Sequence, residues 1–260
     1  MDIELFFKNN SIDDFSIGNV DTIKAPKGFH PKDILPESKR IIVFGKLIPE
    51  YIFKLDCKIK SYYLYKLIDK MDKVSFELCE ILNKEGFSSI SVPTFFPARI
   101  RKGKIRGIIS LKHCAEAVGM GSIGENTLLI SKTFGNRLCL SAVLTQKSFN
   151  IVTNCNNDEL CLKCNRCIDI CPTHAIGNKG LEVTKCVNFT HSIPKFLKPV
   201  ILIMMQMKCA EKYVENMVNI MGWNSDMICS DCLTVCPHFG KNINSYNDAN
   251  SADAKSSAAD

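Results

Sequence analysis

The second half of the chain contains a cysteine motif whose spacing strongly restricts what can form there. The motif is Cys161-x-x-Cys164-x-x-Cys167-x-x-x-Cys171-Pro172, a spacing typical of bacterial ferredoxins that bind [4Fe–4S] clusters. Three thiolates separated by two residues each can wrap a tight loop around one cubane cluster, while the fourth reaches a neighbouring cluster. We expect a helix to begin at Cys171, with Pro172 in its first turn, where no backbone donor is needed.

A second, shorter motif lies near the end of the chain. It is Cys229-x-x-Cys232-x-x-x-Cys236-Pro237, and Asp226 stands where the first motif has its leading cysteine. One ligand must therefore come from another part of the chain. Zinc is the alternative metal, since C-x-x-C pairs also build zinc sites, but three successive two-residue gaps followed by Cys-Pro favour iron and sulfide.

The remote ligand is chosen among three cysteines outside the motifs. Cys186, between the motifs, is favoured over Cys209, which lies in a helical segment, and over Cys155, which lies too close to the first motif. Exchanging the fourth ligands between the motifs predicts two ligand sets. The sets are Cys161, Cys164, Cys167 and Cys236 for one cluster, and Cys171, Cys186, Cys229 and Cys232 for the other.

Composition supports metal ligands over disulfides. The chain has 260 residues and 14 cysteines, and its first residues lack the basic and long apolar segments of a secretory signal. We therefore expect a cytoplasmic protein without a membrane partner, since the longest apolar run, 199–207, is too short to cross a bilayer. Two clusters with their thiolates would lower the formal charge of +6 to about +2, so the charge is weak support for a nucleic-acid partner. Four other cysteines are expected to be buried apolar side chains: Cys57, Cys79, Cys114 and Cys139.

The first half shows helix and strand patterns in alternation. A β-branched strand is expected over 40–44, closed by Gly45, and an amphipathic helix over 61–85, stopped by Gly86. A strand over 88–92 follows.

The alternation continues to about Thr145. Ser110 is expected to cap a helix over 111–118 that Gly119 ends, and strands are expected over 128–130 and 138–144 with a turn at 134–136. The change from alternating helix and strand patterns to cysteine-rich segments predicts two domains. An α/β or α+β domain is expected over 1–152, and a cluster domain over 153–241 with a methionine-rich helical insertion at 199–223. The polar, alanine-rich tail over 242–260 is expected to be disordered.

A glycine-rich segment matches the dinucleotide-binding fingerprint but lacks the strand and helix that normally surround it. Gly119, Gly121 and Gly124 satisfy G-x-G-x-x-G, but a helix pattern precedes them and no βαβ unit follows. We therefore reject a dinucleotide site. From spacing alone, Gly119 and Gly121 cap a helix and turn the chain.

The same region resembles a particular family. The segments 110–113, 119–130, 134–137 and 143–145 are similar to those of the epoxyqueuosine reductases, which are grouped with reductive dehalogenases as cobalamin-dependent iron–sulfur proteins. The cysteine order, including the lone Cys186, is similar to their cluster module, and the resemblance runs from about Arg40 to Phe239. It implies an α+β chain in which a nitroreductase-like corrinoid-binding domain precedes a ferredoxin-like domain with two [4Fe–4S] clusters.

The resemblance also implies cofactors, partners and site residues. A cobalamin would lie base-off between the domains, supplied with electrons by an external low-potential donor of the ferredoxin or flavodoxin type. The substrate would be a small molecule or an RNA. An electron-transfer protein that reduces another corrinoid protein, without its own substrate, is the alternative. The residues implied near the corrin are Lys112, His113, Gly121, Ser122, Gly124, Asn126, Thr127 and Thr190, with a packed position as the alternative for His113.

The sequence departs from the family in two places. The family has an aspartate proton donor shortly before the glycine-rich segment, whereas residues 92–101 contain no acid. Many members also have a C-terminal helical extension associated with tRNA, which is not present after the clusters here. No catalytic residue is assigned: Tyr62, Tyr63 and Glu125 could donate a proton, but a structural role is favoured for each of them. The basic run of Arg99, Arg101, Lys102, Lys104 and Arg106 is interpreted as a solvated hairpin tip in preference to a phosphate contact.

Overall fold

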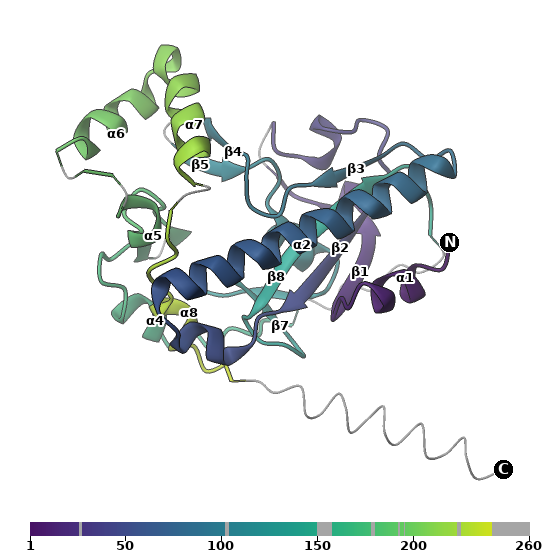
Figure 1. Ribbon diagram of the computed structural model, residues 1–260, viewed down its shortest axis with the longest axis horizontal. Helices are drawn as coiled ribbons and strands as arrows, with labels where there is room; N and C mark the ends of the chain where they lie inside the picture. The colour runs from purple at the N-terminus through teal and green to yellow at the C-terminus, as the bar shows by residue number, and fades with distance from the viewer. Residues whose placement is uncertain are drawn as a thin grey trace, which may run out of the picture.

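A four-stranded antiparallel sheet forms the centre of the first domain in this computed structural model (Figure 1). The structure describes residues 1–25, 28–101, 104–149, 158–177, 180–191, 193–194, 196–222 and 225–240. The strands lie in the order β1 (Asp14–Asn19), β2 (Arg40–Leu47), β8 (Leu138–Thr145) and β3 (Ser89–Val92). The two central strands are the apolar runs that sequence predicts, so the α+β prediction is confirmed.

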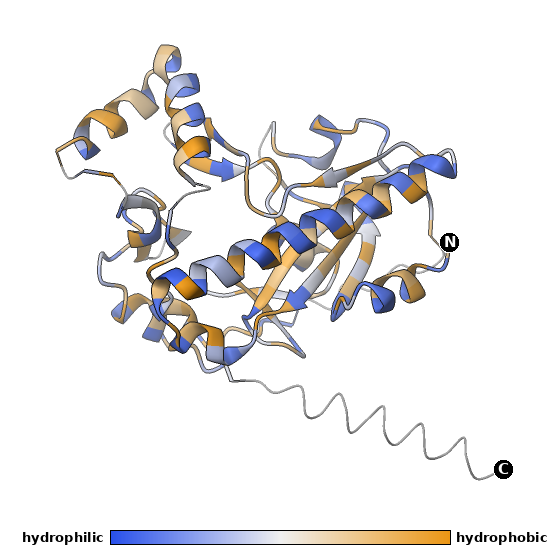
Figure 2. Cartoon of the chain, in the orientation of Figure 1, coloured by the Kyte–Doolittle hydropathy of each residue, from blue (hydrophilic) through white to orange (hydrophobic). Residues whose placement is uncertain are grey.

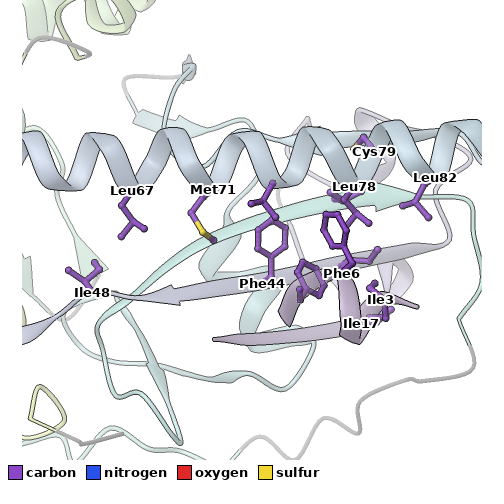
Figure 3. Packing of buried hydrophobic residues seen from close by; sticks show 14 of the residues in the cluster. Ile3, Phe6, Ile17, Phe44, Ile48, Leu67, Met71, Leu78, Cys79 and Leu82 are labelled. Atoms are coloured by element: carbon purple, nitrogen blue, oxygen red, sulfur yellow. The ribbon is translucent and has the colours of Figure 1, made fainter. Parts of the chain in front are cut away.

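One helix covers one face of this sheet. Helix α2 (Cys57–Lys84) begins after Asp56, whose carboxylate accepts a bond from the Lys58 amide, and ends before Gly86 at φ +87°. Its apolar stripe and α1 (Ile3–Asn9) enclose a core around Phe44, and Figure 3 shows Leu67, Met71 and Leu78 pointing onto the strands. In Figure 2 the strands are mostly orange beneath α2, which alternates between blue and orange. This is the amphipathic pattern of a helix with one buried side.

A shorter helix covers the opposite face. Helix α3 (Leu111–Ala117) packs Cys114, Ala115 and neighbouring residues onto Ile41 and Val43. Gly119 adopts φ +82° and donates to the Glu116 carbonyl, which ends the helix as predicted. The prediction that Gly45 closes its strand is wrong. Gly45 lies inside β2, opposite Leu140, and leucine side chains from β8 fill the space beside it.

A partly buried carboxyl at the start of β1 makes stability depend on pH. Burial raises the pKa of Asp14 from 3.8 to about 6; a backbone hydrogen bond at Phe15 opposes this shift and the Asp13 charge adds to it. Because the pKa is raised on folding, the folded state binds more protons, and stability falls as pH rises from about 4 to 6. We expect Asp14→Asn to raise the free energy of unfolding by about 1–3 kcal/mol at pH 8 and by about half as much at pH 5. Urea unfolding at the two pH values measures this, and an equal gain at both would contradict it.

Two hairpins extend from the sheet. One pairs β4 (Ala98–Arg101) with β5 (Lys104–Gly107), and the other pairs β6 (Gly121–Ile123) with β7 (Leu129–Ser131). The predicted basic hairpin therefore exists, with Arg99 opposite Arg106, although Lys102 lies outside the described residues. Three 3-10 helices complete the first domain: Val20–Thr22, Pro31–Asp33 and Glu50–Lys54.

The methionine-rich insertion contains two helices. Helix α6 (Lys198–Gln206) ends at Met207, whose extended backbone breaks the run before α7 (Lys208–Gly222). The pair packs on β4 through Ile100 and apolar residues of both helices. Asn219 and Glu215 also accept hydrogen bonds from the amides of Ala98 and Ile100.

Short elements carry the cysteine region. They are α4 (Arg166–Asp169), β9 (Ile176–Gly177), β10 (Gly180–Leu181), α5 (Val187–Thr190) and α8 (Asp231–Thr234). Trp223, Cys155 and the predicted tail over 242–260 lie outside the described residues. Within the described part of the chain, every helix is too short or too polar to cross a bilayer.

Candidate metal centre

The two cysteine motifs fold into similar short segments that lie together. Helices α4 and α8, one from each motif, contact each other (Figure 1). Lys163 and Asn165 adopt left-handed backbone conformations between the first three cysteines, which gives the loop its tight curvature. The predicted helix at Cys171 is wrong: α4 ends at Asp169, and Pro172 lies in a turn closed by the His174 amide on the Cys171 carbonyl.

Four thiols gather at one hollow. Burial raises the pKa of Cys167, and the nearby thiols of Cys161, Cys236 and Cys164 raise it further. The same hollow is also lined by Gly124, Glu125, Asn126 and Ile130 of the first domain and by His238. The first predicted ligand set is thus brought together across the two motifs, with Cys236 beside the first three.

The other four thiols gather next to them. Burial raises the pKa of Cys232 to about 12, with further contributions from Cys229, Cys186 and Cys171. The lone Cys186 therefore lies with the second predicted set. Its competitor Cys209 is exposed on α7.

Backbone amides surround one thiol of the second group. Burial alone would raise the pKa of Cys171, but backbone N–H groups of Thr173, Ala175 and Ile176 outweigh it and lower the pKa. The Ala175 amide is 3.2 Å from this sulfur, and such donors stabilise a thiolate ligand. The eight ligands themselves stay a prediction.

Asparagine side chains hold the second motif in place. Asn126 and Asn136, from the first domain, donate to the carbonyls of Cys232 and Leu233 at 3.0 Å each. Asn188, on α5, bonds both the amide and the carbonyl of Cys229 at 2.7 Å. These amides match the fixed donors and acceptors of a backbone loop, so they set the positions of its cysteines.

The segment after the second motif docks on the turn before β8. Arg137 is buried and donates to the carbonyls of Phe239, at 2.6 Å, and Ile48, at 3.0 Å. Gly135 has φ +60°, and a Cβ atom there would lie 1.9 Å from the His238 carbonyl oxygen. The close approach leaves no room for any side chain.

The glycine-rich loop also faces the cluster domain. Ser122 accepts a 2.8 Å hydrogen bond from the Leu160 amide, and Thr127 lies beside Gly180. Gly121 has no room for a side chain because a Cβ atom would lie 2.0 Å from the Ile130 carbonyl oxygen. The need for glycine at this position therefore comes from the β6–β7 pairing.

Of the other residues implied near a corrin, Lys112 and His113 lie on the helix before this loop, and Thr190 lies on α5. Burial lowers the pKa of Lys112, which donates to the Thr127 carbonyl at 2.7 Å. His113 bonds Ser110 at 2.5 Å, and burial followed by the Lys112 charge lowers its pKa. Thr190 is buried at the end of α5. Their contact with a corrin stays a prediction, as does the contact of Gly124.

Several residues that hold this region were not identified from the sequence. They are Lys60, Ser61, Tyr65, Asn136 and Asn188. The local sequence does not indicate the role of these polar residues, because their hydrogen-bond partners lie far away in the chain.

Comparisons with known proteins agree with this geometry. Residues 160–239 match the 4Fe-4S double cluster binding domain family. The matched range lies within the predicted cluster domain of 153–241. The epoxyqueuosine reductase of Lactococcus garvieae is 27% identical over 163 residues, which cover 62% of this chain and 40% of the relative. That of Bacillus anthracis is 31% identical over 133 residues, covering 50% and 30%. The chain thus spans less than half the length of these relatives.

Solved structures give the same result. Epoxyqueuosine reductase from Streptococcus thermophilus has a TM-score of 0.57 at 19% identity, covering 92% of this chain and 66% of that one. An epoxyqueuosine reductase with an epoxyqueuosine-modified tRNA stem loop gives 0.57 at 16%, with the same coverage. A reductive dehalogenase described with a B12-dependent mechanism gives 0.50 at 12%, covering 84% and 35%. The chain is therefore similar to the epoxyqueuosine reductases in sequence and fold, and it carries a 4Fe-4S double cluster binding domain behind an α+β domain.

Proposed function

We propose that this chain is a corrinoid-dependent iron–sulfur reductase that takes single electrons from a low-potential donor through two [4Fe–4S] clusters. The observation that carries the proposal is the arrangement of eight thiols in two adjacent groups beside the glycine-rich loop. The double-cluster match and the fold likeness to epoxyqueuosine reductases and a B12-dependent dehalogenase support it.

The residues of the chain have separate tasks in this proposal. Thiolates of the two sets would hold the clusters, and the asparagine amides and Arg137 keep the second motif against the first domain. The loop 121–127 and Thr190 would line the corrinoid from its two sides. A bound corrinoid supplies the cobalt at which the substrate is reduced. An RNA substrate, as in the tRNA complex of the relative, is one form of the proposal.

Anaerobic reconstitution tests the proposal. The purified chain is supplied with iron, sulfide and cobalamin, and we expect about eight irons per chain, bleaching by dithionite and a changed optical spectrum of the cobalamin. Cys209→Ala is the matched control, because this exposed cysteine lies outside both groups and its loss should leave the iron content unchanged. A chain that holds zinc or no metal, or that leaves the cobalamin spectrum unaltered, contradicts the proposal.

A second candidate is an electron-transfer protein that reduces a separate corrinoid protein. The observation in its favour is the lack of an acid in residues 92–101. In the structure, the backbone amide of Thr94 in this stretch donates a 2.8 Å hydrogen bond to the carboxylate of Asp72 on α2. Reduction of an added corrinoid protein, without turnover of an epoxyqueuosine-containing RNA by the chain alone, would favour this candidate.

A further inference from the structure

A buried lysine lies directly beneath the second cysteine motif. Lys60, in the first turns of α2, exposes only 5% of its surface. Its ammonium group is 3.4 Å from the Ile228 carbonyl and 3.4 Å from the Ser230 hydroxyl. Figure 1 shows the start of α2 beside α8. A cation from the first domain is thus placed against the loop that carries Cys229 and Cys232.

Lys60 has no ion-pair partner in the part of the chain that the structure describes, since no carboxylate there lies within 4.0 Å of its ammonium nitrogen. Asp56, one turn earlier on α2, accepts from the Lys58 amide, and Asp226 and Asp231 on the facing loop form no ion pair with Lys60. The two hydrogen bonds are long for a charged donor. A buried ammonium group with such partners is costly unless an anion lies near it.

The predicted cluster would be that anion. Four thiolates around an oxidised [4Fe–4S] core carry a net charge of about −2, which becomes about −3 after one electron is added. Ser230, which Lys60 contacts, lies between Cys229 and Cys232. A fixed positive charge at this place favours the reduced form over the oxidised one.

We propose that Lys60 is a positioning residue that supplies the counter-charge to the cluster of Cys171, Cys186, Cys229 and Cys232, and so raises the reduction potential of that cluster relative to the other. This rests on the proposed function. The step it affects is the gain of one electron by the cluster, in which no bond forms or breaks.

The lysine and the arginine in the loop of the other thiol group differ from Lys60 in their exposure. Lys163 and Arg166 are both exposed, and Lys163 is paired with Glu159 at 2.7 Å. Exposed charges are screened by water and salt, whereas a buried charge is not. The effect of Lys60 should therefore be specific to one cluster.

Redox titration of single-site variants tests this inference. The reconstituted holoprotein and its Lys60→Met, Lys60→Arg and Lys58→Met variants are titrated anaerobically and followed by EPR, which reports each cluster separately. Lys60→Met should lower the equilibrium constant for reduction of one cluster about tenfold or more, which for one electron is about 59 mV. The other cluster serves as an internal reference. Lys60→Arg should restore most of the potential, and Lys58→Met, which removes an exposed charge from the same turn, should change neither.

The outcomes separate this inference from the proposed function. Two reducible clusters with unchanged potentials in Lys60→Met would overturn the role of Lys60 and leave the reductase proposal intact. If Lys60→Met loses about four irons while Lys60→Arg keeps about eight, the charge is needed to hold the cluster, which supports the inference. Loss of the cluster in both variants would make Lys60 a packing residue and overturn it. A wild-type chain without iron defeats the proposed function itself.

Discussion

Replacing Cys161 and Cys236 together by alanine is expected to leave one complete cluster of about four irons, whereas replacing Cys161 and Cys171 is expected to leave none complete. The first pair belongs to one predicted ligand set, so the second set keeps all its thiolates. The second pair removes one thiolate from each set. The structure supports this grouping because Cys236, and not Cys171, lines the same hollow as Cys161, Cys164 and Cys167.

Iron and sulfide analysis with Mössbauer spectroscopy after anaerobic reconstitution measures the number of complete clusters. Cys114→Ala is the control, since this thiol is fully buried in the first domain and burial raises its pKa to about 12. If Cys161 and Cys171 prove to be the pair whose loss spares one cluster, each motif binds its own cluster and the crossed assignment is wrong.

Adding one methyl group at Gly135 is expected to have a large effect on stability. The Cβ atom of Gly135→Ala would lie 1.9 Å from the His238 carbonyl oxygen, and the backbone has φ +60°. A left-handed alanine costs about 1–2 kcal/mol and overpacking adds about 1–3 kcal/mol, so we expect a loss of about 2–5 kcal/mol in the free energy of unfolding. Because the displaced segment includes Pro237 and Cys236, the first cluster should also be lost more readily to a chelator.

Gly86→Ala is the matched control for this variant. Gly86 has a similar conformation, with φ +87°, but nothing lies within 4 Å of the added methyl group. The expected loss is about 1–2 kcal/mol, from backbone strain alone. Anaerobic urea unfolding of the two holoprotein variants compares them, and equal losses would show that the contact with His238 does not hold the segment.

Local patterns predicted β2, α2, β3, α3, β7 and β8 of the first domain, but not α1 or β1. The C-terminal ends of α2 and α3 were predicted because Gly86 and Gly119 adopt left-handed conformations that few other residues tolerate. The start of α2 was predicted at residue 61, whereas the helix begins at Cys57. Glycine was a poor guide at Gly45, where the end of a strand was predicted. This glycine lies within β2, and the leucine side chains beside it come from β8, which the local sequence does not reveal. The predicted helix at Cys171 failed for a related reason: a proline after cysteine suits a turn as well as a first helical turn.

The contacts that hold the cysteine region could not be predicted in this way. Asn126 and its acceptor at Cys232 are 106 residues apart, and Lys60 and Ser230 are 170 apart. Such pairs depend on how the sheet, α2 and the cluster loops are arranged in space. By contrast, cysteine spacing is a local property tied to one chemical task, which is why the grouping of the thiols could be anticipated.

The position of the last motif beside both thiol groups has a consequence for how the protein is made. A ribosome that has completed the first motif has produced only three of the thiols expected in one group and one of those in the other, because Cys186, Cys229, Cys232 and Cys236 come later. Neither iron site is complete until this final stretch has left the exit tunnel. Loading with metal is then expected late, after the residues of the sheet and its covering helices have been made.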